Sequence, residues 1–130
     1  SSAASDVYKR QVSTTLLHYP SFVLDVKNAI SSGLVKEKID QVKTAQVLIL
    51  DDIGAEQSSP WMRDEILQVI LQHRMQENLP TFFTSNFSFA DLERHFASSK
   101  NGDETWQAKR VMERIKFLAQ EVRLEGENRR

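Results

Sequence analysis

The sequence predicts an α/β fold in which helices cover a parallel β-sheet. The strongest indication is a continuous apolar run at residues 47–50 (VLIL), flanked by polar residues. A strand buried on both faces of a parallel sheet has such a run, because neither face needs polar side chains. Strand-like segments also alternate with helical segments of roughly 10–17 residues, which is the order of a parallel α/β fold. The length of 130 residues fits one domain, which at this size buries roughly two-thirds of its unfolded surface.

Four elements are expected in the first part of the chain. Residues 12–19 (VSTTLLHY) are rich in β-branched and large apolar side chains and predict a strand. After Pro20, apolar residues at helical spacing predict a helix over 21–30, which stops at a Ser-Ser-Gly sequence. A short helix is expected over 35–42. The apolar run then forms a strand over 46–50 that ends at two aspartates.

The second part begins with a helix whose first residues are well suited to that position. Ser59 is a favourable N-cap, and Pro60 fits the first helical turn. Further on, Ser88 and Asp91 form a capping-box pair. The remaining expected elements are a strand over 81–85, a helix over 88–96, a polar loop over 97–103, a helix that Asp103 caps and that runs to about 118 with an apolar face of Trp106, Val111, Ile115 and Leu118, and a short strand over 121–124.

Composition excludes several classes of site. The chain has no cysteine, which excludes disulfide frameworks, thiolate zinc sites and thiol nucleophiles. The histidines lack metal-ligand spacing and are expected to be ordinary residues; they are His18, His73 and His95. A net charge of −1 argues against a polyanion binder held by bulk charge. No apolar run approaches the roughly 20 residues of a membrane span, so we expect a cytoplasmic protein. None of the four glycines precedes a lysine, so the phosphate-cradling loop G-x-x-x-x-G-K-[ST] is absent from these residues.

Three residues at predicted strand ends are candidates for chemistry, because ligands of parallel sheets bind outside the carboxyl ends of the strands. Asp51 and Asp52 follow the apolar run. One carboxylate there can hold hydrated Mg²⁺, and its neighbour can polarise an attacking water. Asn86 follows the next strand, where an amide can orient a water or a phosphate oxygen. The alternative is that all three are ordinary turn residues.

Two arginines form the other candidate group. Arg110 and Arg114 are four residues apart on a predicted helix, so they share a face, and guanidinium groups match phosphate oxygens. The alternative is a surface pair balanced by Glu113. Seven basic and four acidic residues lie in 109–130, whereas six acidic and two basic residues lie in 45–78. This polarity suits head-to-tail association across a polyanion, and equally suits solubility alone.

The order of these motifs is specific. VLILDDIGAE, LPTFFTSN, KRVMERI and a terminal NRR together resemble the ATPase domain of bacterial replicative helicase loaders of the DnaI and DnaC type, which are primosome components and AAA+ ATPases. The resemblance covers residues 12–130. It implies a three-layer parallel sheet of the P-loop AAA+ type that is incomplete, because in the family the first strand and the Walker A loop precede this segment. We therefore expect a C-terminal fragment, with residues 1–11 as a disordered or non-native leader and 12–130 as a partial ATPase domain.

The resemblance implies a role for each matched position. Asp51 would be the Walker B acid at Mg²⁺, and Asp52 would stand where many family members have the catalytic glutamate. Its side chain is one methylene shorter, which implies slower hydrolysis. Asn86 would be the sensor-1 residue that faces the γ-phosphate.

The basic residues would act at the edges of the nucleotide site. Arg114 would be the arginine finger that reaches the nucleotide of a neighbouring subunit, with Arg110 in support. Arg129 or Arg130 would make a sensor-2-like contact.

The function implied is ATP-dependent loading of the replicative DNA helicase at the start of DNA replication, with ATP and Mg²⁺ as cofactors of the intact protein. The implied partners are the helicase, single-stranded DNA and further copies of the protein associating through the ATP site. We expect the fragment alone to be inactive. The alternatives are a DNA-transposition accessory ATPase of the same fold and a non-enzymatic DNA- or protein-interaction module.

Overall fold

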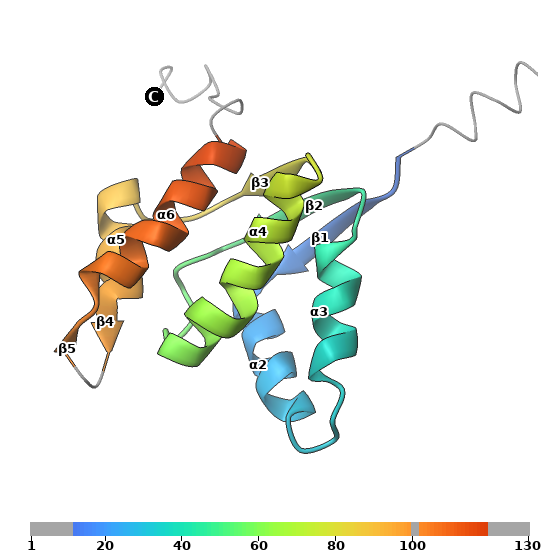
Figure 1. Ribbon diagram of the computed structural model, residues 1–130, viewed down its shortest axis with the longest axis horizontal. Helices are drawn as coiled ribbons and strands as arrows, with labels where there is room; N and C mark the ends of the chain where they lie inside the picture. The colour runs from blue at the N-terminus through green and yellow to red at the C-terminus, as the bar shows by residue number, and fades with distance from the viewer. Residues whose placement is uncertain (1–11, 100–101, 120–130) are drawn as a thin grey trace, which may run out of the picture.

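The computed structural model of the chain describes residues 12–99 and 102–119 (Figure 1). In chain order the elements are β1 (Thr14–His18), α2 (Tyr19–Ala29), α3 (Val35–Lys43), β2 (Val47–Asp51), the π-helix η1 (Met62–Leu67), α4 (Gln68–Gln76), β3 (Thr81–Phe83), α5 (Phe89–Ala97), β4 (Ser98–Ser99), β5 (Gly102–Asp103) and α6 (Thr105–Ala119).

The main sheet has three parallel strands in the order β1-β2-β3, with β2 in the centre. His18 of β1 pairs with Asp51 of β2, and Leu50 pairs with Phe83 of β3. The carboxyl ends of all three strands therefore lie at one edge of the sheet. The α/β fold with a parallel sheet that the sequence predicts is confirmed.

One face of the central strand forms the floor of the hydrophobic core. Leu48 and Leu50 are fully buried there. The apolar run predicts burial on both faces, but Val47 and Ile49 on the other face are only partly buried. α4 contacts both α3 and α6 (Figure 1), and each helix turns an apolar stripe inward because of its helical spacing. The core side chains from the helices include Phe22, Val23, Val26, Ile66, Ile70, Leu71, Val111, Met112 and Ile115.

A buried arginine of α4 forms hydrogen bonds with the end of α3 and with the residues at the starts of β2 and β3. Arg74 of α4 is 0% exposed. Its Nε donates to Thr81 Oγ1 at 2.7 Å, its Nη1 to the carbonyls of Val42 and Ala45 at 3.2 and 2.6 Å, and its Nη2 to the carbonyl of Pro80 at 2.8 Å. Burial lowers its pKa to about 10, so the guanidinium remains charged at neutral pH. It fixes the end of α3 and the starts of β2 and β3 relative to α4.

The helix expected after Ser59 begins as predicted but continues differently. The Ser59 hydroxyl accepts the backbone N–H of Met62 at 3.2 Å, which confirms the N-cap. The next turns form the π-helix η1. Within it, the buried Arg63 donates to the carbonyl of Phe96 at 2.9 Å and pairs with Glu104 at 2.7 Å. These contacts tie η1 to α5 and to the residue that precedes α6.

Two expected boundaries are wrong. β3 ends at Phe83 instead of residue 85, because Thr84 and Ser85 form hydrogen bonds with the segment that follows β2. The expected polar loop contains the short antiparallel pair β4 and β5.

The start of α6 also differs from the expectation. α6 begins at Thr105, and Asp103 lies in β5, where its carboxylate accepts the Thr105 hydroxyl at 2.7 Å. Trp106 was expected in the core and is 67% exposed; the Arg110 guanidinium lies 5.0 Å from the centre of its ring. The expected leader (1–11) and last strand (121–124) lie outside the described residues.

Candidate functional site

Hydrogen bonds join the segments that follow β2 and β3 at the carboxyl edge of the sheet. We call residues 51–56 the acidic loop and residues 84–87 the post-β3 segment. The Thr84 hydroxyl donates to Asp51 Oδ1 at 2.6 Å and accepts the backbone N–H of Asp52 at 2.8 Å. The N–H of Ile53 donates to the Thr84 carbonyl at 2.9 Å. The structure therefore brings both aspartates beside the segment that carries Asn86, which is exposed.

The backbone of the acidic loop turns sharply after the strand. Asp52 has a φ of 63°, a left-handed conformation that costs a non-glycine residue about 1 kcal/mol or more. Gly54 has a φ of 107°, and a Cβ at that position would lie 2.8 Å from Phe87 Cδ2. Close packing against the post-β3 segment therefore requires glycine at position 54.

The end of β1 contributes a third group that the sequence did not single out. His18 Nε2 lies 3.5 Å from Asp52 Oδ2, and its Nδ1 lies 2.8 Å from Ser21 Oγ. The sequence predicts an ordinary role for His18, and this contact makes it a further candidate at the same edge. A signal was present, because His18 ends a predicted strand and therefore belongs at the same edge of the sheet.

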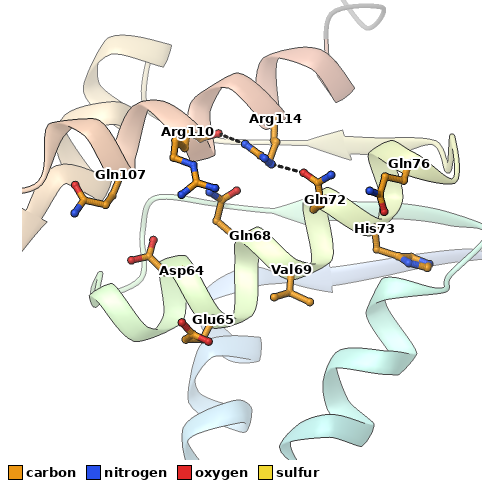
Figure 2. Close-up of a pocket in the computed structure, with 10 residues that line it drawn as sticks. All are labelled: Asp64, Glu65, Gln68, Val69, Gln72, His73, Gln76, Gln107, Arg110 and Arg114. Carbon is orange, nitrogen blue, oxygen red and sulfur yellow. Dashed lines mark hydrogen bonds between the residues drawn. The ribbon is translucent and has the colours of Figure 1, made fainter.

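The two arginines line a different surface. Arg114 Nε donates to Gln72 Oε1 at 2.7 Å, and its Nη1 donates to the carbonyl of Arg110 at 3.1 Å (Figure 2). Both arginines line a groove of about 630 Å³ between α6 and the η1–α4 helices, whose other lining residues are Asp64, Glu65, Gln68, Val69, Gln72, His73, Gln76 and Gln107. The two arginines therefore line a groove to which Asp51 and Asp52 do not belong. Arg129 and Arg130 lie outside the described residues.

The ligand set available to a metal ion is small. Among residues 12–99 and 102–119, no cluster of three or more His, Asp or Glu side chains could hold a metal ion. A lone strand-end carboxylate, Asp51, fits Mg²⁺, which keeps several waters and shares its remaining ligands with phosphate. In the same part of the chain, no helix is long and apolar enough to cross a membrane.

Comparison with known proteins identifies relatives over nearly the whole chain. The family model described as IstB-like ATP binding protein matches residues 5–130. The replicative helicase loader DnaI of Bacillus subtilis is 47% identical over 128 residues, which are 98% of this chain and 41% of that protein. The chain therefore spans about two-fifths of the length of this curated relative.

Solved structures agree with this relationship. A crystal structure of DnaI has a TM-score of 0.75 at 42% identity, with 87% of this chain and 58% of that chain covered. A putative primosome component from Streptococcus pyogenes serotype M3 has a TM-score of 0.64 at 63% identity, covering 85% and 51%. The DnaC helicase loader, at 22% identity, a TM-score of 0.60 and coverage of 82% and 60%, shows the fold alone. The resemblance to helicase loaders that the motifs indicate is confirmed.

Proposed function

Because this chain belongs to the IstB-like ATP-binding proteins, we propose that it is the part of an ATPase domain that responds to bound ATP during loading of a replicative helicase onto DNA. The observation that carries this proposal is the meeting of Asp51, Asp52 and the post-β3 segment at one edge of the sheet. Its second support is the 47% identity to a protein named replicative helicase loader.

Asp51 and Asp52 divide the chemistry between them in this proposal. Asp51 holds the water shell of Mg²⁺, which when bound neutralises charge on the phosphates. Asp52 orients the attacking water, and its contact with His18 keeps the carboxylate directed along the edge of the sheet. Asn86 presents an amide to the terminal phosphate. The aspartate reaches less far than a glutamate, so slow turnover is expected.

Arg114 acts on a neighbouring copy. It lies in the groove beside α4, apart from the acidic loop of its own chain, which is the arrangement expected for a guanidinium that completes the site of the next subunit. A positive charge supplied across an interface makes hydrolysis depend on assembly. Arg110, whose carbonyl accepts from Arg114, supports this residue.

A chimeric loader tests the proposal. In this "loader chimera", the 130-residue chain replaces the matching 128-residue segment of the Bacillus subtilis relative. We expect it to hydrolyse ATP in a Mg²⁺-dependent reaction, to associate when ATP is bound, and to retain the replicative helicase of that organism in a pull-down with single-stranded DNA. A folded chimera that neither turns over ATP nor retains the helicase would contradict the proposal.

The sequence motifs leave a second candidate, an accessory ATPase of DNA transposition with the same fold. The same pull-down separates the two functions. Retention of a transposase in place of the helicase would favour the second.

A further inference from the structure

Glu56 is a buried carboxylate that the proposed function leaves without a role. Its side chain is 4% exposed, and that of His95 on α5 is 15% exposed. Glu56 Oε1 accepts the backbone N–H of Gly54 at 2.8 Å, and Oε2 lies 2.8 Å from His95 Nε2. Both carboxylate oxygens are thus hydrogen-bonded, which is what makes burial of the charge tolerable.

This pair links the acidic loop to α5. Glu56 closes the loop onto its own backbone at Gly54, two residues after Asp52, and the second oxygen connects the loop to a helix 39 residues further along the chain. Burial, together with the negative charge of Glu56, raises the pKa of Tyr19 at the start of α2 well above its usual value. The contacts that hold the loop are those of Glu56 with Gly54 and with His95.

The same helix supports the residue expected at the γ-phosphate. The His95 ring packs edge-on against Phe87, with 5.9 Å between ring centres. Phe87 donates its N–H to Ser85 Oγ at 3.1 Å, and that hydroxyl donates to the carbonyl of Ile53 at 2.5 Å. Asn86 stands between two residues that are each held by this network.

We propose that Glu56 and His95 are positioning residues that hold the loop carrying Asp52 in register with the segment carrying Asn86. The inference rests on the proposed function, because register between these two residues matters only if both face one nucleotide. Neither Glu56 nor His95 touches the reacting atoms. Their effect on the reaction is exerted through the backbone at Gly54 and through the ring of Phe87.

A role in positioning differs measurably from a role in stability alone. Loss of register lowers kcat and leaves the KM for ATP nearly unchanged, whereas loss of folded protein lowers the active fraction. Glu56→Gln preserves an acceptor for Gly54 and a partner for His95, so it separates the hydrogen bonds from the charge. Glu93→Ala is a matched control, since Glu93 is an acid on α5 that pairs with Lys109 at 3.2 Å, away from the acidic loop.

The experiment compares Glu56→Ala, His95→Ala, the double variant, Glu56→Gln and Glu93→Ala in the loader chimera. We expect kcat to fall about tenfold or more in both alanine variants, as for other residues that orient a reactive group, with KM within about twofold. The double variant should lose less than the product of the two single losses, because the two substitutions share the Glu56–His95 link. Glu56→Gln should keep at least half of the turnover, and Glu93→Ala all of it.

A second measurement needs no nucleotide. Amide hydrogen exchange of the 130-residue chain should show the Gly54 N–H protected in the original chain and in Glu56→Gln, and exchanging about tenfold faster in Glu56→Ala. The inference would be overturned if folded Glu56→Ala kept the kcat of the unaltered chimera. It would also be overturned if Glu56→Gln and Glu56→Ala lowered kcat equally. An unaltered chimera without turnover would overturn the proposed function and this inference with it, a result distinct from a defect confined to the variants.

Discussion

The Thr84 hydroxyl bonds to both aspartates of the acidic loop, so Thr84→Val removes these two bonds between the segments without changing the shape of the side chain. The hydroxyl donates to Asp51 Oδ1 at 2.6 Å and accepts the N–H of Asp52 at 2.8 Å. A hydrogen bond to a charged group contributes about 1.5–3 kcal/mol and a neutral one about 0.5–1.5 kcal/mol. Thr84 is exposed, so water replaces part of both bonds, and we expect a loss of about 2 kcal/mol in the free energy of unfolding.

Urea unfolding of the 130-residue chain measures this loss. With a slope of about 1.5 kcal/mol per molar, the midpoint should fall by about 1.3 M. The matched control is Thr44→Val, because the Thr44 hydroxyl donates only to the carbonyl of Asp40 at 2.7 Å, at the end of α3. That variant should lose about 0.5 kcal/mol. A fall for Thr84→Val that is no larger than the fall for Thr44→Val would refute the claim that Thr84 joins the two segments.

Three further predictions concern the buried residues Arg74 and Tyr19 and the groove residue Arg114. Arg74→Met leaves four carbonyls and the Thr81 hydroxyl without their donor and should cost about 4 kcal/mol in urea unfolding; a loss below about 1 kcal/mol would show that the guanidinium is dispensable. Arg114→Ala in the loader chimera should lower kcat about 10³-fold with ATP affinity kept in a fluorescent-nucleotide titration, and unchanged turnover would remove the arginine-finger assignment. The raised pKa of Tyr19, from an ordinary value of 10.0, keeps the phenol neutral in the folded chain while it ionises in the unfolded one, so stability falls as the pH rises above 10. Tyr19→Phe should lose less stability than the original chain between pH 8 and pH 11, and parallel losses would contradict the assignment.

The sequence predicted the elements whose signals are local. The apolar run placed β2 within one residue of its observed bounds (Val47–Asp51), because four consecutive apolar residues between polar ones favour a central strand of a parallel sheet. The N-cap role of Ser88 is also confirmed, since its hydroxyl accepts the N–H of Asp91 at 3.1 Å. The other half of the capping box is not seen, because the Asp91 carboxylate pairs with Arg94. The position of Asp51 and Asp52 at the carboxyl edge of the sheet could also be predicted, because parallel strands all end on the same side.

The features that the sequence did not predict depend on partners far away along the chain. Arg74 carries a charge on what is otherwise an apolar face, and only the carbonyls of three other segments make its burial favourable. The pairing of Glu56 with His95 spans 39 residues and leaves no periodic signal. Trp106 lies five residues before Val111, which is not helical spacing, so it points away from the buried face of Ala108, Val111, Met112 and Ile115. Arg110 covers part of its ring instead.

The most direct test of the central claim locates the metal of the bound nucleotide on the chain. Fe²⁺ replaces Mg²⁺ in the ATP complex of the loader chimera, and peroxide with ascorbate then cleaves the backbone next to the metal. We expect ATP-dependent cuts at residues 51–52 and 84–86 that are lost in Asp51→Asn. Cuts that arise only elsewhere on the chain, or that appear equally without ATP, would contradict the central claim.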